Sequence, residues 1–304
     1  MLATRLATGL TLVAALLAVL ILDERLAPWY PLWFATTTIV MAVCSMEMVG
    51  LLRATGVRPS GNTVFGGAVA LVLANWAPHV VHQLGIDPSR PIPPSYEPTA
   101  AVDVMAWPLW TYVAVLMAAF LSQSLQFRKP GATMATIAGT ILIVSYVGLL
   151  GSFIIQMRWF EGPYHGLIPL AALVATAKGS DTGAYTLGRI AGRTKLWPRL
   201  SPNKTVEGAI GGLIFGVIGS LIVTAIARYA LRAPCLDWPA SVGFGLVVAP
   251  AAQLGDLMES MIKRDCARKD ASSAVPGFGG LLDVLDSLLF AGPIAYGYWI
   301  WLGP

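Results

Sequence analysis

The stretch GAIGGLIFGVIGSLIVTAIA, residues 208–227, decides the fold class of this chain. It continues for 20 residues without a charged side chain. An α-helix needs about 20 apolar residues to cross the hydrocarbon core of a bilayer, which is about 30 Å thick. The stretch therefore predicts a membrane-spanning helix.

The composition of the whole chain agrees with this prediction. The 304 residues are 56% hydrophobic and only 12% charged, with a mean hydropathy of +0.68, whereas soluble domains carry about 25% charged residues. So few charges cannot cover the surface of a water-soluble globule, which excludes a cytosolic enzyme, a disordered regulator and a secreted disulfide scaffold. The chain is predicted to be an all-α polytopic membrane protein. Its net charge of +4 is too small to indicate a nucleic-acid partner.

About nine stretches meet the length criterion for a membrane span. They lie near residues 6–22, 32–52, 64–84, 103–121, 133–156, 166–187, 206–231, 241–261 and 281–302. If the N-terminus lies inside, 14 Lys and Arg residues fall in inside loops, five fall outside, and Lys178 lies within a span. Because basic loops remain in the cytoplasm, this asymmetry predicts a cytoplasmic N-terminus.

Ionisable residues at membrane depth are costly, and they are functional candidates by default. In the first five predicted spans they are limited to Glu47 and Asp103, whereas most of the others lie between residues 178 and 286. We therefore expect N-terminal scaffold helices over residues 1–160 and catalytic helices with cytoplasmic loops over residues 161–304. For Glu47 two interpretations stay open, a carboxylate satisfied inside the helix bundle and a group that lines the site.

Two polar segments open the C-terminal part. In Lys178-Gly-Ser-Asp-Thr-Gly-Ala-Tyr185, Asp181 nears the cytoplasmic end of its span, where a carboxylate can hold a cation or cap a helix. Ser201-Pro-Asn-Lys-Thr is typical of a helix start. Free amides at a helix N-terminus, with Lys204 and Arg199 beside them, favour a bound phosphate. The alternative interpretation is an ordinary basic loop.

A third segment brings carboxylates together. On a helix, Asp256, Glu259, Ser260 and Lys263 fall at i, i+3, i+4 and i+7 and share one face. Asp283 and Asp286 are spaced i, i+3 on the next predicted helix, beyond a Gly-rich turn. Two antiparallel helices can therefore direct these carboxylates to one point, where hard oxygen ligands suit Mg²⁺.

Basic residues accompany these carboxylates and are suited to neutralise phosphoryl charge. They are Lys263, Arg264, Arg268 and Lys269. Metal-binding and phosphate-binding groups at a membrane face predict phosphoryl or nucleotidyl transfer on a lipid. Interhelical salt bridges are the alternative, although they explain only part of this set.

The third segment resembles the phosphatidate cytidylyltransferase (CDP-diacylglycerol synthase) family. The family pattern has Ser-x-x-Lys-Arg, four intervening residues, Lys-Asp, a Pro-Gly-His-Gly-Gly turn and an ending like Asp-Arg-x-x-Asp or Asp-Arg-x-Asp. The matching residues are Ser260, Lys263, Arg264, Lys269, Asp270, Pro276, Gly277, Gly279, Gly280, Asp283 and Asp286. Residues 180–185 and 201–208 also resemble family segments. Phe278 replaces the histidine of the turn, and Val284 replaces an arginine.

The resemblance implies transfer of CMP from CTP to phosphatidate, which yields CDP-diacylglycerol and pyrophosphate. It implies catalytic roles for Asp256, Lys263, Asp283 and Asp286, and Mg²⁺ or a similar hard cation on Asp256, Asp283 and Asp286, with room for a second cation. The implied substrate-binding residues are Asp181, Ser201, Lys204, Thr205, Glu207, Ser260, Arg264, Lys269 and Asp270. The implied partners are membrane lipids and a second copy of the chain, in a bacterial inner membrane with the active site facing the cytoplasm.

Three alternative functions stay open at this point. A related enzyme could use CTP on another lipid. An inactive lipid-binding relative is suggested by Phe278 and Val284. An ion-coupled transporter is suggested by the intramembrane carboxylates. Carriers commonly have paired repeats with interrupted spans in both halves, whereas the polar features here occupy one half, which disfavours transport.

Overall fold

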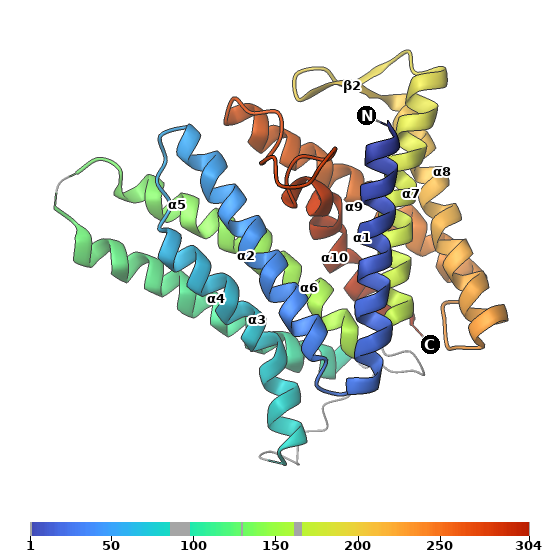
Figure 1. The fold of residues 1–304 in the computed structure, drawn as a ribbon, viewed down its shortest axis with the longest axis horizontal. Helices are drawn as coiled ribbons and strands as arrows, with labels where there is room; N and C mark the ends of the chain where they lie inside the picture. Colours follow the sequence, from blue (N-terminus) through green and yellow to red (C-terminus); the bar gives the residue numbers. More distant parts are fainter. Residues whose placement is uncertain (1, 86–97, 129, 161–165, 304) are drawn as a thin grey trace. The chain divides into compact units, whose positions relative to one another are not determined.

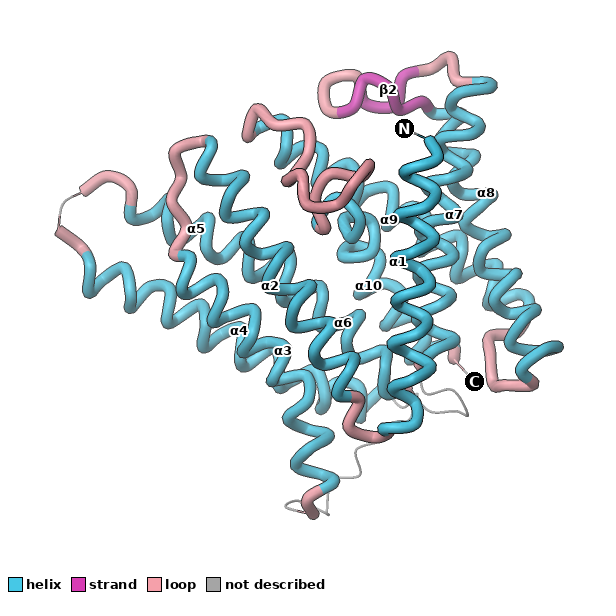
Figure 2. Tube along the Cα trace, in the orientation of Figure 1, coloured by secondary structure: helices cyan, strands magenta, loops and turns pink. Residues whose placement is uncertain are grey.

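In the computed structural model, which describes residues 2–85, 98–128, 130–160 and 166–303, the described residues are mostly helical (Figures 1 and 2). The helices are α1 (Leu2–Asp23), α2 (Pro31–Ala54), α3 (Gly61–Gln83), α4 (Pro98–Gln126), α5 (Thr133–Ile143), α6 (Leu150–Gln156), α7 (Leu167–Ala191), α8 (Val206–Ala225), α9 (Trp238–Asp265) and α10 (Leu282–Leu302). Two short strands, β1 (Lys195–Trp197) and β2 (Ser201–Thr205), pair in antiparallel fashion between α7 and α8.

Each predicted span coincides with a helix or with a continuous helical run. The run over α5 and α6 includes a π-helical turn at Val144–Leu149, and a second π-helical turn, Ile226–Leu231, extends α8. Within the described residues, six helices are long and apolar enough to cross a membrane. They are Pro31–Ala54, Gly61–Gln83, Val102–Gln126, Thr133–Trp159, Val206–Leu231 and Trp238–Asp265. The count of nine spans stays a prediction.

The outer surfaces of these helices are apolar. On α4, Trp110 is 71% exposed, Met117 65% and Leu125 80%. Extended apolar surface of this kind is rare on proteins that face water on all sides, and lipid tails solvate it without penalty. The protein is therefore an integral membrane protein.

The chain forms two compact units. Unit 1 comprises residues 1–92, 102–155 and 265–284, and unit 2 comprises residues 93–101, 156–264 and 285–304. Unit 2 thus contains α7, the β1–β2 hairpin, α8, α9 as far as Arg264, and most of α10. The sequence predicted a boundary between scaffold and catalytic parts at residue 160, next to residues 161–165, which the structure does not describe. That boundary is a statement about function and not about compact units, so it stays a prediction.

Within unit 2, α7 and α8 pack unusually closely. A Cβ atom on Gly183 would lie 2.3 Å from the carbonyl oxygen of Gly211, and one on Gly211 would lie 2.6 Å from Cβ of Leu187. Small residues permit such an approach between helices in a membrane. Gln253 of α9 is tied to the pair, because its Nε2 donates to Ser180 Oγ and to the Ala209 carbonyl, both at 3.1 Å. These contacts hold α7, α8 and α9 together, the three helices that line the cavity described below.

The hairpin corrects one expectation. Residues 201–205 were expected to start a helix, but they form β2, and α8 begins at Val206. The Thr205 side chain accepts a hydrogen bond from the backbone N–H of Gly208 at 3.1 Å, as an N-cap residue does. The helix therefore begins where the span near 206–231 was predicted, and residues 201–205 form a strand instead of its first turn.

Candidate active site

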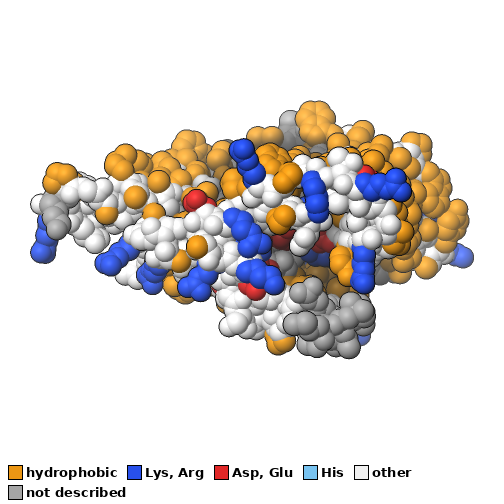
Figure 3. All heavy atoms as spheres, turned by 90° about the horizontal axis from the view of Figure 1, so that it is seen from above, with side chains coloured by type: hydrophobic (Ala, Val, Ile, Leu, Met, Phe, Trp, Pro, Cys, Tyr) orange, Lys and Arg blue, Asp and Glu red, His pale blue; other side chains and the backbone are white. Residues whose placement is uncertain are grey.

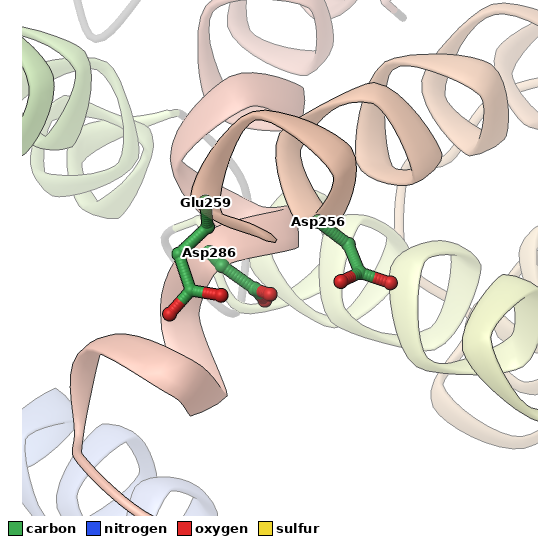
Figure 4. Close-up of side chains that lie close together, drawn as sticks. All are labelled: Asp256, Glu259 and Asp286. Atoms are coloured by element: carbon green, nitrogen blue, oxygen red, sulfur yellow. The ribbon is translucent and has the colours of Figure 1, made fainter. Parts of the chain in front are cut away.

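Three carboxylates meet where α9 and α10 pack in unit 2. Asp256 and Glu259 extend from successive turns of α9, and Asp286 extends from α10 (Figure 4). One carboxylate oxygen from each residue lies within 4.8 Å of the others. A Cβ atom on Gly255 would lie 2.6 Å from the carbonyl oxygen of Asp286, so a glycine at 255 permits this close approach of α10. The predicted shared face of Asp256 and Glu259 is confirmed.

The cluster is deeply buried on one side and open on the other. Glu259 is fully buried and Asp286 is 6% exposed, whereas the Asp256 side chain is 36% exposed. Buried charges are tolerated when they are paired. Lys263 forms an ion pair with Glu259 one turn along α9, and Lys204 of β2 lies 2.7 Å from Asp256. A ligand can therefore approach from the Asp256 side.

Helix α7 contributes a further cation and a further carboxylate. The Lys178 ammonium donates to Asp181 Oδ2 at 3.1 Å and to Ser287 Oγ of α10 at 3.0 Å, and it interacts electrostatically with Asp286. Sequence reasoning noted Lys178 inside a span but gave it no role. Its i, i+3 spacing to Asp181 was the available signal, because a carboxylate cluster in a membrane requires neighbouring cations.

A cavity of about 460 Å³ adjoins this arrangement, within the size range of small-molecule sites. Its polar lining includes Asp181, Tyr185, Arg189, Asn203, Lys204, Thr205, Gln253 and Asp256. Asp181, Lys204, Thr205 and Asp256 were predicted site residues, and the structure brings them to one cavity. Tyr185 and Arg189 were missed, although they follow Asp181 at i+4 and i+8 and so share its helix face.

Glu207 holds the base of the hairpin. Its carboxylate accepts hydrogen bonds from the backbone N–H groups of Arg193 and Thr194, each at 3.1 Å. These residues precede β1, while Glu207 follows β2, so this side chain closes the loop formed by the hairpin. Together with the Thr205 cap, it positions Asn203 and Lys204 in the cavity wall.

The remaining predicted residues are not among the described residues that line the cavity or form the carboxylate cluster. In unit 1, Asp283 Oδ2 accepts the backbone N–H groups of Gly280 at 2.6 Å and Ala271 at 2.9 Å. Arg264, Lys269 and Asp270 are exposed. Ser201 and Ser260 are partly exposed and are not among the described residues that line the cavity.

The donor set suits a hard divalent cation. The grouped carboxylates of Asp256, Glu259 and Asp286 supply only oxygen ligands, and Mg²⁺ binds to one or two carboxylates together with substrate phosphates. Two of the three predicted metal ligands, Asp256 and Asp286, belong to this group. The third member, Glu259, was placed on the right face by the sequence but was not assigned as a ligand.

Comparison with known proteins gives a consistent result. A model described as the cytidylyltransferase family matches residues 3–301. The phosphatidate cytidylyltransferase of a Synechocystis strain is 29% identical, over 92% of this chain and 91% of that protein. The enzymes of the same name from Staphylococcus saprophyticus and Bacillus subtilis are 36% and 35% identical, over 51% of this chain and 55% of each relative.

Proposed function

Because the chain belongs to the cytidylyltransferase family, we propose that it transfers CMP from CTP to phosphatidate, which gives CDP-diacylglycerol and pyrophosphate for phospholipid synthesis. The similarities to phosphatidate cytidylyltransferases support this substrate pair. The single observation that carries the proposal is the cavity wall, where Lys204 and Arg189 lie with Asp181 and Asp256 in an integral membrane protein.

The reaction is a displacement at phosphorus. A phosphate oxygen of phosphatidate attacks the α-phosphorus of CTP, the bond from that phosphorus to the bridging oxygen breaks, and pyrophosphate leaves with the bonding electrons. Such chemistry depends on positioning and on electrostatic stabilisation rather than on a covalent protein intermediate. Lys204 lies in the cavity wall, where its ammonium can bind a phosphate, and Arg189 offers a planar guanidinium that matches phosphate geometry.

We assign the metal to the carboxylate cluster. Asp256 and Asp286 are the proposed ligands, Glu259 lies within reach of the same point, and Asp283 is kept as a proposed ligand from the family pattern. A bound Mg²⁺ would supply charge neutralisation for the triphosphate and the leaving pyrophosphate. Asp181 is held by Lys178 and is the proposed ligand for a second cation.

The remaining predicted residues are proposed to bind the substrates. Lys263, Arg264 and Lys269 are proposed phosphate ligands, with Asp270 positioning Lys269. Ser201 and Ser260 are proposed hydrogen-bond donors to substrate, and Thr205 and Glu207 act by holding the hairpin.

We further propose nine membrane spans, with the N-terminus and the active site on the cytoplasmic side of a bacterial inner membrane. The hairpin region carries Arg193, Lys195, Arg199 and Lys204, and Lys and Arg side chains are exposed on the face of the molecule seen from the hairpin side (Figure 3). Basic loops favour the cytoplasm. A homodimer is also proposed, for which the exposed stripe of Ile210, Ile214, Ile218 and Ile222 on α8 is a suitable surface.

Purified protein in detergent, supplied with CTP, Mg²⁺ and phosphatidate, should release pyrophosphate. Parallel reactions without lipid, with other lipid phosphates and with lipid alcohols identify the acceptor. If pyrophosphate were released only with another lipid, that lipid and not phosphatidate would be the acceptor substrate. No release with any lipid would contradict the proposed function.

A further inference from the structure

The segment between α9 and α10, residues 266–281, has little regular secondary structure, although it carries Lys269 and Asp270 and leads directly into Asp283. Part of it is a tight turn, in which the Val275 N–H donates to the Gly279 carbonyl at 2.7 Å and the Gly279 N–H donates back at 3.0 Å. Asp283 joins the two ends through Ala271 and Gly280. These hydrogen bonds hold the segment to itself and to Asp283, and a further contact with another helix of unit 1 would fix its position.

Glu47 of α2 supplies such an anchor. Its Oε1 accepts hydrogen bonds from Ser272 Oγ at 2.6 Å and from the Leu281 N–H at 3.1 Å, and its Oε2 accepts from the Leu282 N–H at 2.8 Å. A single side chain therefore contacts the segment at two places that are nine residues apart in the sequence. Of the two interpretations that the sequence left open for Glu47, the first is supported directly, because its carboxylate accepts hydrogen bonds inside the protein. These hydrogen bonds also connect Glu47 to the segment that carries the predicted site residues Lys269 and Asp270.

The hydrogen bonds between the Glu47 carboxylate and the backbone N–H groups at the start of α10 have a clear physical basis. The first N–H groups of a helix lack intrahelical partners, and a carboxylate is favourable there because the helix dipole is positive at that end. A Cβ atom on Gly280 would lie 2.7 Å from Glu47 Oε2. Glu47 can therefore reach these amides only because residue 280 is a glycine.

We propose that Glu47 is a positioning residue for the transfer reaction: it holds the 266–281 segment and the start of α10 so that Lys269, Asp270 and Asp283 stay in place. This role rests on the proposed function. A glutamine at position 47 keeps one acceptor oxygen but turns an NH₂ group toward backbone N–H donors. The Glu47→Gln variant should therefore lose this anchor while preserving the size of the side chain.

Hydrogen–deuterium exchange on the full-length protein in detergent tests the anchor without reference to activity. In Glu47→Gln, exchange of peptides covering 271–282 should rise about tenfold or more, since hydrogen bonds to a charged group are among the strong ones. Peptides from α7 and α8 should exchange as in the wild type. Unchanged exchange at 271–282, or a uniform rise along the whole chain, would overturn the proposal.

Steady-state kinetics with CTP and phosphatidate tests the link to the reaction. If Glu47 positions phosphate-binding groups, KM for CTP should rise about tenfold in Glu47→Gln, whereas mere loss of folded enzyme would lower kcat at constant KM. Asp103→Asn, which neutralises an exposed carboxylate on α4, is the matched control and should leave KM unchanged. An unchanged KM in Glu47→Gln would overturn the role in the reaction.

Gly280→Ala provides a second variant that leaves Glu47 intact. It should raise KM and segment exchange as Glu47→Gln does, and the double variant should be no worse than the poorer single variant, because both changes break one contact. If the effects of Glu47→Gln and Gly280→Ala on KM and on exchange added up in the double variant, the two residues would not act through one contact, and the proposal would be overturned. Wild-type protein without CTP-dependent turnover would contradict the proposed function instead, and the exchange measurement would still decide whether Glu47 holds the segment.

Discussion

Glu259 shows how a single buried charge constrains the site. It is fully buried, it lies within 4.8 Å of two other carboxylates, and Lys263 forms an ion pair with it. Lys263 is itself only 13% exposed, so water contributes little to either charge. The pair therefore has a structural role in addition to any contact that Lys263 makes with a phosphate.

Replacing Lys263 by Met should destabilise the protein by about 3 kcal/mol or more, because the buried Glu259 carboxylate loses its ion pair with Lys263. The double variant Lys263→Met/Glu259→Met should recover most of that stability, because it removes both charges. Denaturant unfolding in detergent measures both effects. Equal stability of wild type and the single variant would contradict the buried pair.

At the scale of elements, the β1–β2 hairpin is a small structure held at its base by side chains. Glu207 accepts two backbone N–H groups from the start of the hairpin, and Thr205 caps α8 at its end. The hairpin contributes Leu196, Asn203, Lys204 and Thr205 to the cavity wall. Loosening its base should therefore disturb ligand binding more than folding.

Glu207→Gln should raise KM for CTP about fivefold to tenfold and leave the free energy of unfolding close to that of the wild type, because the hydrogen bonds that it weakens are exposed. Initial rates over a range of CTP concentrations, with an unfolding curve, provide the measurement. Glu24→Gln, a similar change outside unit 2, is the control. A large loss of stability with unchanged KM would contradict the role assigned to the hairpin.

The contact between α7 and α8 is a second element that can be tested. Gly183→Ala places a methyl group against the Gly211 carbonyl, where an ideal Cβ atom would lie only 2.3 Å away. Forced packing of this kind costs about 1–3 kcal/mol. Gly50→Ala on α2 is the matched control, because its Cβ atom would meet nothing within 4 Å, and it should cause no loss. Equal stability of the two variants would contradict the close packing.

At the scale of the whole molecule, the sequence predicted what depends on local spacing. Apolar length located the long α-helical runs of the described residues, and the i, i+3 rule placed Asp256 and Glu259 on one face. Local spacing in the sequence could not show that Lys178 contacts Ser287 or that Glu47 caps α10, because the residues in these two pairs lie 109 and 235 positions apart. The same limit explains why Glu259 was not assigned to the metal cluster, since its place there depends on how α10 packs against α9.

The central claim is that the carboxylate cluster of unit 2 carries out nucleotidyl transfer to a lipid. The most direct test is the rate at which label from [α-³²P]CTP appears in CDP-diacylglycerol, when phosphatidate is supplied to the wild type, to Asp256→Asn and to Asp265→Asn, an exposed control on the same helix. Asp256→Asn should be slower by about 10²–10³-fold or more, as expected when a group that stabilises the transition state electrostatically is lost, and the control should match the wild type. Labelled CDP-diacylglycerol formed by Asp256→Asn at the wild-type rate would contradict the claim.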